Sequence, residues 1–264
     1  MRRTALRAAR AIMGLGGAAH AATCTWTNGW DALPSSTTDV IVVSSGGNLT
    51  WSNTFPATVA SWTQDATYSG TATFTTVYGA AGFTNFTVSG DVTLQGGAWT
   101  HVGNTSTEAN RMRVTVGGNL FITNATLNAR GKGYSANNGP GAGVYENRGA
   151  AHGGVGYYEE QYGDPNLKTY GSIVSPTNLG SGGGDGGSLG GGAILVSVAG
   201  TTTVAVGSSI VAPGSIASRG GGSGGSVYLT TGWLAGGGTI SANGGSNYGA
   251  GGGRVAIVLT AGDF

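Results

Sequence analysis

Charged residues are scarce in this chain. Only 9% of its 264 residues are Asp, Glu, Lys or Arg, and the formal net charge is +1. Ordinary soluble domains carry about 25% charged residues. A net charge this small does not steer a protein toward nucleic acid or an anionic lipid surface. We therefore expect no nucleic-acid partner.

Cysteine, proline and long apolar runs are also scarce. Cys24 is the single cysteine, which excludes an intramolecular disulfide and a metal site built from several cysteines. Only six prolines are present and the glycines have no three-residue period, which excludes collagen. No apolar run reaches the roughly 18 residues of a transmembrane helix. The sequence predicts no membrane insertion, no metal and no cofactor.

Residues 1–22 have two competing interpretations. A stretch with four arginines precedes the short apolar run AIMGLGGAA and the small-residue site Ala19-His20-Ala21, and this order is typical of a secretory signal peptide. The rival interpretation is an N-terminal capping helix, because the apolar residues between Leu6 and Met13 would share one helical face. The first interpretation predicts a protein that is secreted or held at the cell surface.

Glycine is abundant, with 54 residues, of which 39 lie in residues 131–264. Three segments begin with Gly-Gly and continue into a β-branched run: residues 191–196, 224–229 and 252–257. Repeats at 20–50 residues are typical of proteins built from repeated units. We expect the strand starts Ala193, Ser226 and Arg254 to lie in the same or adjacent columns. By alternation along the strands, the residues expected to point inward are Ile194, Val196, Val198, Val227, Leu229, Val255, Ile257 and Leu259.

Short strands bounded by Gly or Asn, with no convincing amphipathic helix after residue 22, predict an all-β fold. The repeats favour a right-handed parallel β-helix, or β-solenoid, with Gly-rich corners. Residues 23–264 would form one domain: Thr/Val-rich turns of the helix in residues 23–130, a long Tyr- and Gly-rich excursion in 131–190, and Gly-rich turns in 191–264. An antiparallel sandwich is the competing architecture.

The stretches NARGKGYSANNGPGAG, GSGGGDGGSLGGGAILV, TISANGG and GGGRVAI together resemble Gly-rich repeat regions of large bacterial surface proteins. Regions of this type resemble those of autotransporter passengers and adhesins. The resemblance spans roughly residues 85–264. It implies a parallel β-helix fold and a surface or adhesive role, and it implies no catalytic residue.

Several motif matches have a simpler explanation in a chain rich in Gly and Ser. Gly186–Gly190 and Gly221–Gly225 match G-x-S-x-G, but no helix is expected after either, as a nucleophile elbow requires. A single Asp185 does not make a repeated calcium-binding turn. Ice binding would need a regular Thr array, and Thr71-Ala72-Thr73 and Thr201-Thr202-Thr203 do not recur at the repeat spacing.

The excursion is the best candidate for a binding surface. It holds six of the ten tyrosines together with several carboxylates, and tyrosines combine buried ring area with a hydroxyl that finds partners. Loop anchoring is the simpler interpretation, and acid–base chemistry on a sugar is a third. The candidate contact residues are Tyr145, Glu146, Tyr157, Tyr158, Glu159, Tyr162 and Asp164.

The expected function is that of a non-enzymatic structural or adhesive protein outside the cell. A carbohydrate-binding or polysaccharide-cleaving protein acting through residues 131–190 is the alternative. Because an unpaired strand edge templates further strands, a final strand containing Val255, Ile257 and Leu259 predicts head-to-tail assembly into a filament. The expected partners are further copies of the chain, or a cell-surface carbohydrate.

Overall fold

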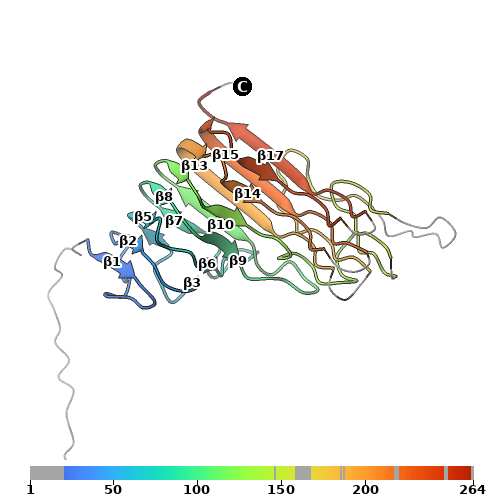
Figure 1. Cartoon of the computed structure of the whole chain (residues 1–264), viewed down its shortest axis with the longest axis horizontal. Helices are drawn as coiled ribbons and strands as arrows, with labels where there is room; N and C mark the ends of the chain where they lie inside the picture. Colours follow the sequence, from blue (N-terminus) through green and yellow to red (C-terminus); the bar gives the residue numbers. More distant parts are fainter. Residues whose placement is uncertain are drawn as a thin grey trace, which may run out of the picture.

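The structure is a computed structural model that describes residues 21–145, 147–157, 168–184, 186, 188–216, 220–246 and 249–262. Every regular element among these residues is a β-strand (Figure 1). The strands are β1 (Thr23–Trp26), β2 (Val40–Val43), β3 (Leu49–Trp51), β4 (Thr58–Val59), β5 (Ser61–Gln64), β6 (Thr71–Phe74), β7 (Phe86–Val88), β8 (Val92–Leu94), β9 (Ala98–His101), β10 (Met112–Val116), β11 (Leu120–Ile122), β12 (Thr126–Asn128), β13 (Ala193–Val204), β14 (Ser209–Val211), β15 (Ser226–Ala235), β16 (Thr239–Ser241) and β17 (Arg254–Leu259).

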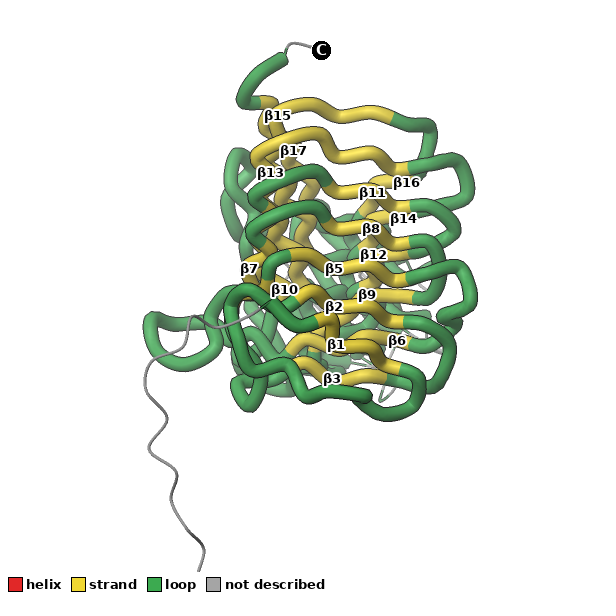
Figure 2. Tube along the Cα trace, turned by 90° about the vertical axis from the view of Figure 1, so that its left-hand side faces the viewer, coloured by secondary structure: helices red, strands yellow, loops and turns green. Residues whose placement is uncertain are grey.

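The strands form two parallel sheets. The larger has 11 strands, with the path β1-β2-β5-β8-β11-β13-β10-β7-β4 and with β15 and β17 added on β13. The smaller has six, in the order β16-β14-β12-β9-β6-β3. Figure 2 shows the strands of each row lying one above another, with connecting loops at the sides. The expected all-strand, parallel character of the chain is thus present.

The expected right-handed parallel β-helix is wrong as a description of this fold, which is a curled parallel sheet. The long strands β13 and β15 are the reason. The first half of β13 pairs with β10 and its second half pairs with β11, so two rows of strands become one curled sheet. The chain does not turn a corner there: only a register shift between Val198 and Thr201 marks the bend.

The register prediction for the Gly-Gly segments is confirmed. Ala193 pairs with Ser226, and Ser226 pairs with Arg254, in one continuous column. The predicted inward positions on β13 and β15 are all buried: Ile194, Val196, Val198, Val227 and Leu229. On β17, Ile257 packs against the core and is half-buried, whereas Val255 remains 41% exposed although it pairs with the buried Val227. No described strand covers β17 on its far side, which explains this exposure.

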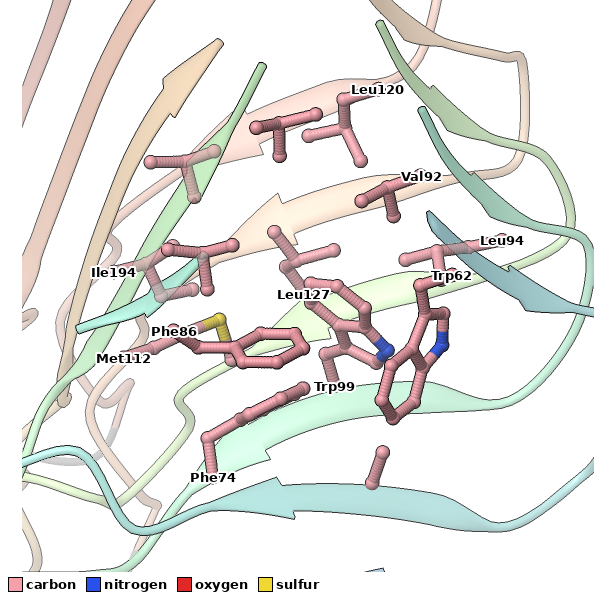
Figure 3. Close-up of a cluster of buried hydrophobic side chains, with 14 of the residues drawn as sticks. Trp62, Phe74, Phe86, Val92, Leu94, Trp99, Met112, Leu120, Leu127 and Ile194 are labelled. Atoms are coloured by element: carbon pink, nitrogen blue, oxygen red, sulfur yellow. The ribbon is translucent and has the colours of Figure 1, made fainter. Parts of the chain in front are cut away.

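The core changes character along the chain. Its N-terminal part is aromatic, with edge-to-face rings that include Trp62 and Trp99 at 5.5 Å and Phe74 and Trp99 at 4.8 Å (Figure 3). Its C-terminal part holds aliphatic residues such as Ile194. Such aromatic contacts add stability beyond the area they bury. The inward side chains of residues 23–130 are therefore larger than those of the C-terminal part of the chain.

Most of the glycine lies outside the strands, in segments that pack backbone against backbone. In the stretch from Gly180 to Gly184, successive amides hydrogen-bond in different directions: the amide of Gly180 donates to the Gly191 carbonyl, that of Gly182 to Asn138, and that of Gly184 to Arg148. A Cβ on Gly180, Gly182 or Gly184 would collide with the backbone of a neighbouring segment. Glycine therefore serves here for close approach of backbones, more than for the sharp corners that the sequence predicts.

Residues 1–20 lie outside the described part, so the signal-peptide and capping-helix interpretations both stay predictions. None of the described residues belongs to a helix that is long and apolar enough to span a membrane.

Candidate ligand-binding groove

The outer face of the large sheet carries a groove of about 430 Å³. It crosses the strands β10, β13 and β15, and the stretch just before β7 contributes Asn85. Its lining residues are Asn85, Arg111, Arg113, Val114, Thr115, Thr177, Leu195, Val196, Ser197, Tyr228 and Thr230.

Strand register places the floor of the groove in two rows. Arg113 pairs with Leu195, which pairs with Tyr228, and this makes the first row. Since neighbouring strands lie about 4.8 Å apart, side chains in a row repeat at that interval across the groove. The second row consists of hydroxyls and lies two residues further along each strand: Thr115, Ser197 and Thr230.

Asn85 closes one end of the hydroxyl row. Its Nδ2 donates to Thr87 Oγ1 at 2.9 Å, and its Oδ1 accepts from Thr115 Oγ1 at 3.3 Å. These bonds fix the amide in one orientation. The row is therefore a preformed set of polar groups, as specific ligand sites usually are.

The excursion supplies one wall of the groove through Thr177. The Thr177 carbonyl accepts a hydrogen bond from the Tyr78 hydroxyl at 2.5 Å. The Glu108 carboxylate accepts from Asn178 Nδ2 at 3.1 Å and from the Leu179 amide at 2.9 Å. These contacts hold the wall against the sheet.

Arg111 lies where this wall meets the sheet. Its guanidinium carbon sits 4.5 Å from the centre of the Tyr78 ring, a cation–π contact. Its Nε is buried and has no hydrogen-bond partner among the described residues. Burial lowers the pKa of Arg111, although the group stays cationic at any physiological pH.

Only part of the predicted contact surface can be placed. Tyr145 is 62% exposed, and the Arg148 guanidinium lies over its ring at 4.6 Å. Tyr157 is 46% exposed, and its amide donates to the Gly249 carbonyl at 2.6 Å. Neither residue lines the groove. The other predicted contact residues, which lie outside the described part of the chain, are Glu146, Tyr158, Glu159, Tyr162 and Asp164.

Sequence reasoning missed the groove residues Arg111, Arg113 and Tyr228. One signal was available, because Arg111, Arg113 and Thr115 alternate with the buried Met112 and Val114. What the sequence does not show is the register between β10 and β13, whose paired residues are 82 positions apart. The groove exists only once that register is known.

The described part of the chain holds no cluster of three or more His, Cys, Asp or Glu side chains suited to a metal ion. No family model, curated protein or solved structure matches this chain. The resemblance to Gly-rich regions of bacterial surface proteins thus remains an expectation drawn from the residues alone.

Proposed function

We propose that this protein is a non-catalytic surface protein that holds glycan chains in the groove across β10, β13 and β15. The observation that carries the proposal is the pairing of an aromatic ring, Tyr228, with a parallel row of hydroxyls on one rigid sheet. Export to the cell surface or the medium belongs to the same proposal. It is supported by the pattern of residues 1–22, with its basic stretch and small-residue site.

Sugars present both apolar C–H faces and hydroxyl groups. An aromatic side chain such as Tyr228 offers a flat apolar surface with a polar end. The hydroxyls of Ser197 and Thr230 can donate and accept hydrogen bonds, and that of Thr115, which donates to Asn85, can still accept one. Because the two rows run across the strands, an extended chain of sugar units would meet hydroxyls along one row, and Arg113, Leu195 and the ring of Tyr228 along the other.

The groove favours binding over hydrolysis of the glycan. Glycoside hydrolysis in most families needs two carboxyl groups flanking the scissile bond, roughly 5–9.5 Å apart. None of the residues that line the groove carries a carboxylate. The competing proposal, a polysaccharide-cleaving protein, predicts new reducing ends when the protein is incubated with a glycan that it binds.

We expect Tyr228→Ala to weaken glycan binding by about tenfold, because the variant loses the aromatic surface of the groove, worth on the order of 1.4 kcal/mol. Affinity electrophoresis through gels containing a soluble plant or bacterial polysaccharide measures the effect. Trp233→Ala is the matched control, since Trp233 lies on the same strand and is 52% exposed but does not line the groove. Equal retardation of wild type and Tyr228→Ala would contradict the proposed site.

Self-association is a second candidate function, and the edge of the large sheet favours it. Among the described strands, β17 pairs only with β15 at one end of the sheet, and at the other end β1 pairs only with β2 and β4 only with β7. The partly buried apolar residues that pack on the core also gather at these two ends: Trp26, Trp30, Phe55, Leu234, Ile240 and Ile257. Joining β17 of one copy to β4 of the next would continue the row of β7, β10, β13 and β15 without closing it.

We expect the wild-type protein to form rods at high concentration and the variant V255K/V258K to remain as single particles. Val255 and Val258 are 41% and 39% exposed, so lysine at these positions adds charge to the contact without opening the core. Negative-stain microscopy and sedimentation compare the two proteins. Single wild-type particles at high concentration would rule out assembly through β17.

A further inference from the structure

We infer that the groove selects acidic glycans, through pairing of Arg111 and Arg113 with anionic groups on the sugar chain. The inference rests on the proposed glycan binding and adds a substrate class to it. The shared chemistry is a carboxylate or a sulfate ester, since the planar fork of a guanidinium matches either group with two parallel hydrogen bonds.

Arg111 carries a buried hydrogen-bond donor that has no partner among the described residues. Buried polar groups in folded proteins almost always have a partner, and each exception calls for an explanation. The buried Nε of Arg111 has no acceptor among the described residues, whereas its guanidinium is held in place against the Tyr78 ring. The Nε is itself shielded from solvent and out of reach of a ligand, but an anion in the groove would offset the charge of the guanidinium.

Neither arginine of the groove forms an ion pair with a described acidic side chain. The nearest described carboxylate that influences Arg111 is Glu108. Both oxygens of Glu108 accept hydrogen bonds from the segment that forms the groove wall, at Asn178 and Leu179. Arg113 is exposed on β10, and among the described residues no acidic side chain forms an ion pair with it. In the described part of the chain, two cations therefore face the groove and no acidic side chain forms an ion pair with either.

The lining of the groove contributes no negative charge, because none of the residues that line it is Asp or Glu. A bound polyanion would therefore meet no negative side chain in the groove lining.

The test compares polygalacturonate, dextran sulfate and an uncharged galactan in titration calorimetry with the full chain. We expect wild type to bind a charged polymer at least tenfold more tightly than the galactan, with an affinity that falls as salt is added. We expect Arg113→Gln to lose about tenfold in affinity for the charged polymer and clearly less for the galactan, so that the ratio of the two affinities falls. Binding of polygalacturonate would identify a carboxylate as the anionic group that the groove recognises, and binding of dextran sulfate would identify a sulfate ester.

Arg130→Gln is the matched control, because Arg130 is exposed and carries the same charge but does not line the groove. An equal loss in both variants would overturn the inference in favour of general attraction between charges. Equal affinity of wild type for the charged and uncharged polymers would also overturn it, while leaving glycan binding in place. Binding that Tyr228→Ala does not weaken would instead contradict the proposed function. Arg111→Gln is assayed alongside, but the exposed Arg113 carries the test because its replacement leaves the fold undisturbed.

Discussion

We expect Gly190→Ala to abolish folding of the Gly-rich part of the protein, a loss of more than about 4 kcal/mol in the free energy of unfolding. A Cβ on Gly190 would lie far inside van der Waals distance of the Gly180 backbone carbonyl. The backbone cannot move aside, because the Gly190 amide donates to Tyr134 at 2.8 Å and its carbonyl accepts from Gly133 at 2.7 Å. Urea denaturation followed by circular dichroism measures the loss.

Gly29→Ala is the matched control for this substitution. No described atom lies within 4 Å of a Cβ added at Gly29, and the residue does not have a positive φ. We therefore expect a change within about 0.5 kcal/mol. If Gly190→Ala were as stable as Gly29→Ala, close backbone packing would not be the reason for the glycines.

The second large effect is a loss of stability in mild acid. Burial lowers the pKa of both His101 and His152 from 6.5 to about 4. Between these values the unfolded chain binds protons that the folded chain does not, so the free energy of unfolding falls as the pH falls. Each histidine contributes about 1.4 kcal/mol per pH unit, and the two together lower the stability by roughly 5 kcal/mol at pH 4.5. Neither contributes a slope well above pH 6.5.

The hydrogen bonds of His101 show why the charged form is excluded. Its Nδ1 donates to the Val102 carbonyl at 2.8 Å, and its Nε2 accepts from the Ala193 amide at 3.2 Å. A proton on Nε2 would face the N–H of Ala193, so neither group could accept and the hydrogen bond between β9 and β13 would be lost. A Cβ at residue 192 would occupy the place of Nε2, so Gly192 leaves the room that the ring needs.

Denaturation curves at pH 7.5, 6 and 5 measure this dependence. His101→Gln should remove about half of the slope between pH 6.5 and 4.5, and His152→Gln the other half. Hydrogen-bonded carboxylates do not mimic the effect, because the pKa values of Asp39 and Asp65 are lowered from 3.8 in the folded protein. The stability that these two groups provide is lost mainly as the pH falls below 3.8. A wild-type stability that stays constant from pH 6.5 to 4.5 would contradict the assignment.

Much of the strand pattern could be predicted from the sequence because it is local. The alternation of Ile194, Val196 and Val198 identifies the buried face of β13, and the Gly-Gly starts identify the register of β13, β15 and β17. Both signals depend only on neighbouring residues and on a repeat of about 30 positions. The part of the prediction that failed is the architecture, because β13 and β15 each continue through the bend between the two rows of strands, where a β-helix would have a separate corner.

The groove could not be predicted in the same way. Its two arginines come from the strand before the excursion, and Tyr228 comes from a strand after it. The hydroxyl row also depends on pairing between distant strands. Thr115, Ser197 and Thr230 are far apart in the sequence, and they form a row only because β10 pairs with β13 across the excursion and β13 pairs with β15. In the sequence, the tyrosines of the excursion therefore stand out, whereas the groove residues on the face that the excursion borders do not.

The separation between β10 and β13 also implies an order of folding. Most neighbouring strands in both sheets are 20–35 residues apart, but β10 meets β13, and β12 meets β14, only after a loop of about 80 residues has closed. Such a loop costs only about 1 kcal/mol more in closure entropy than one of 30 residues. It nevertheless divides the chain into an N-terminal group of strands and a C-terminal group, each of which can pair within itself over short separations. Only the contacts of β13 with β10 and β11, and of β14 with β12, have to wait until the excursion brings the two groups together.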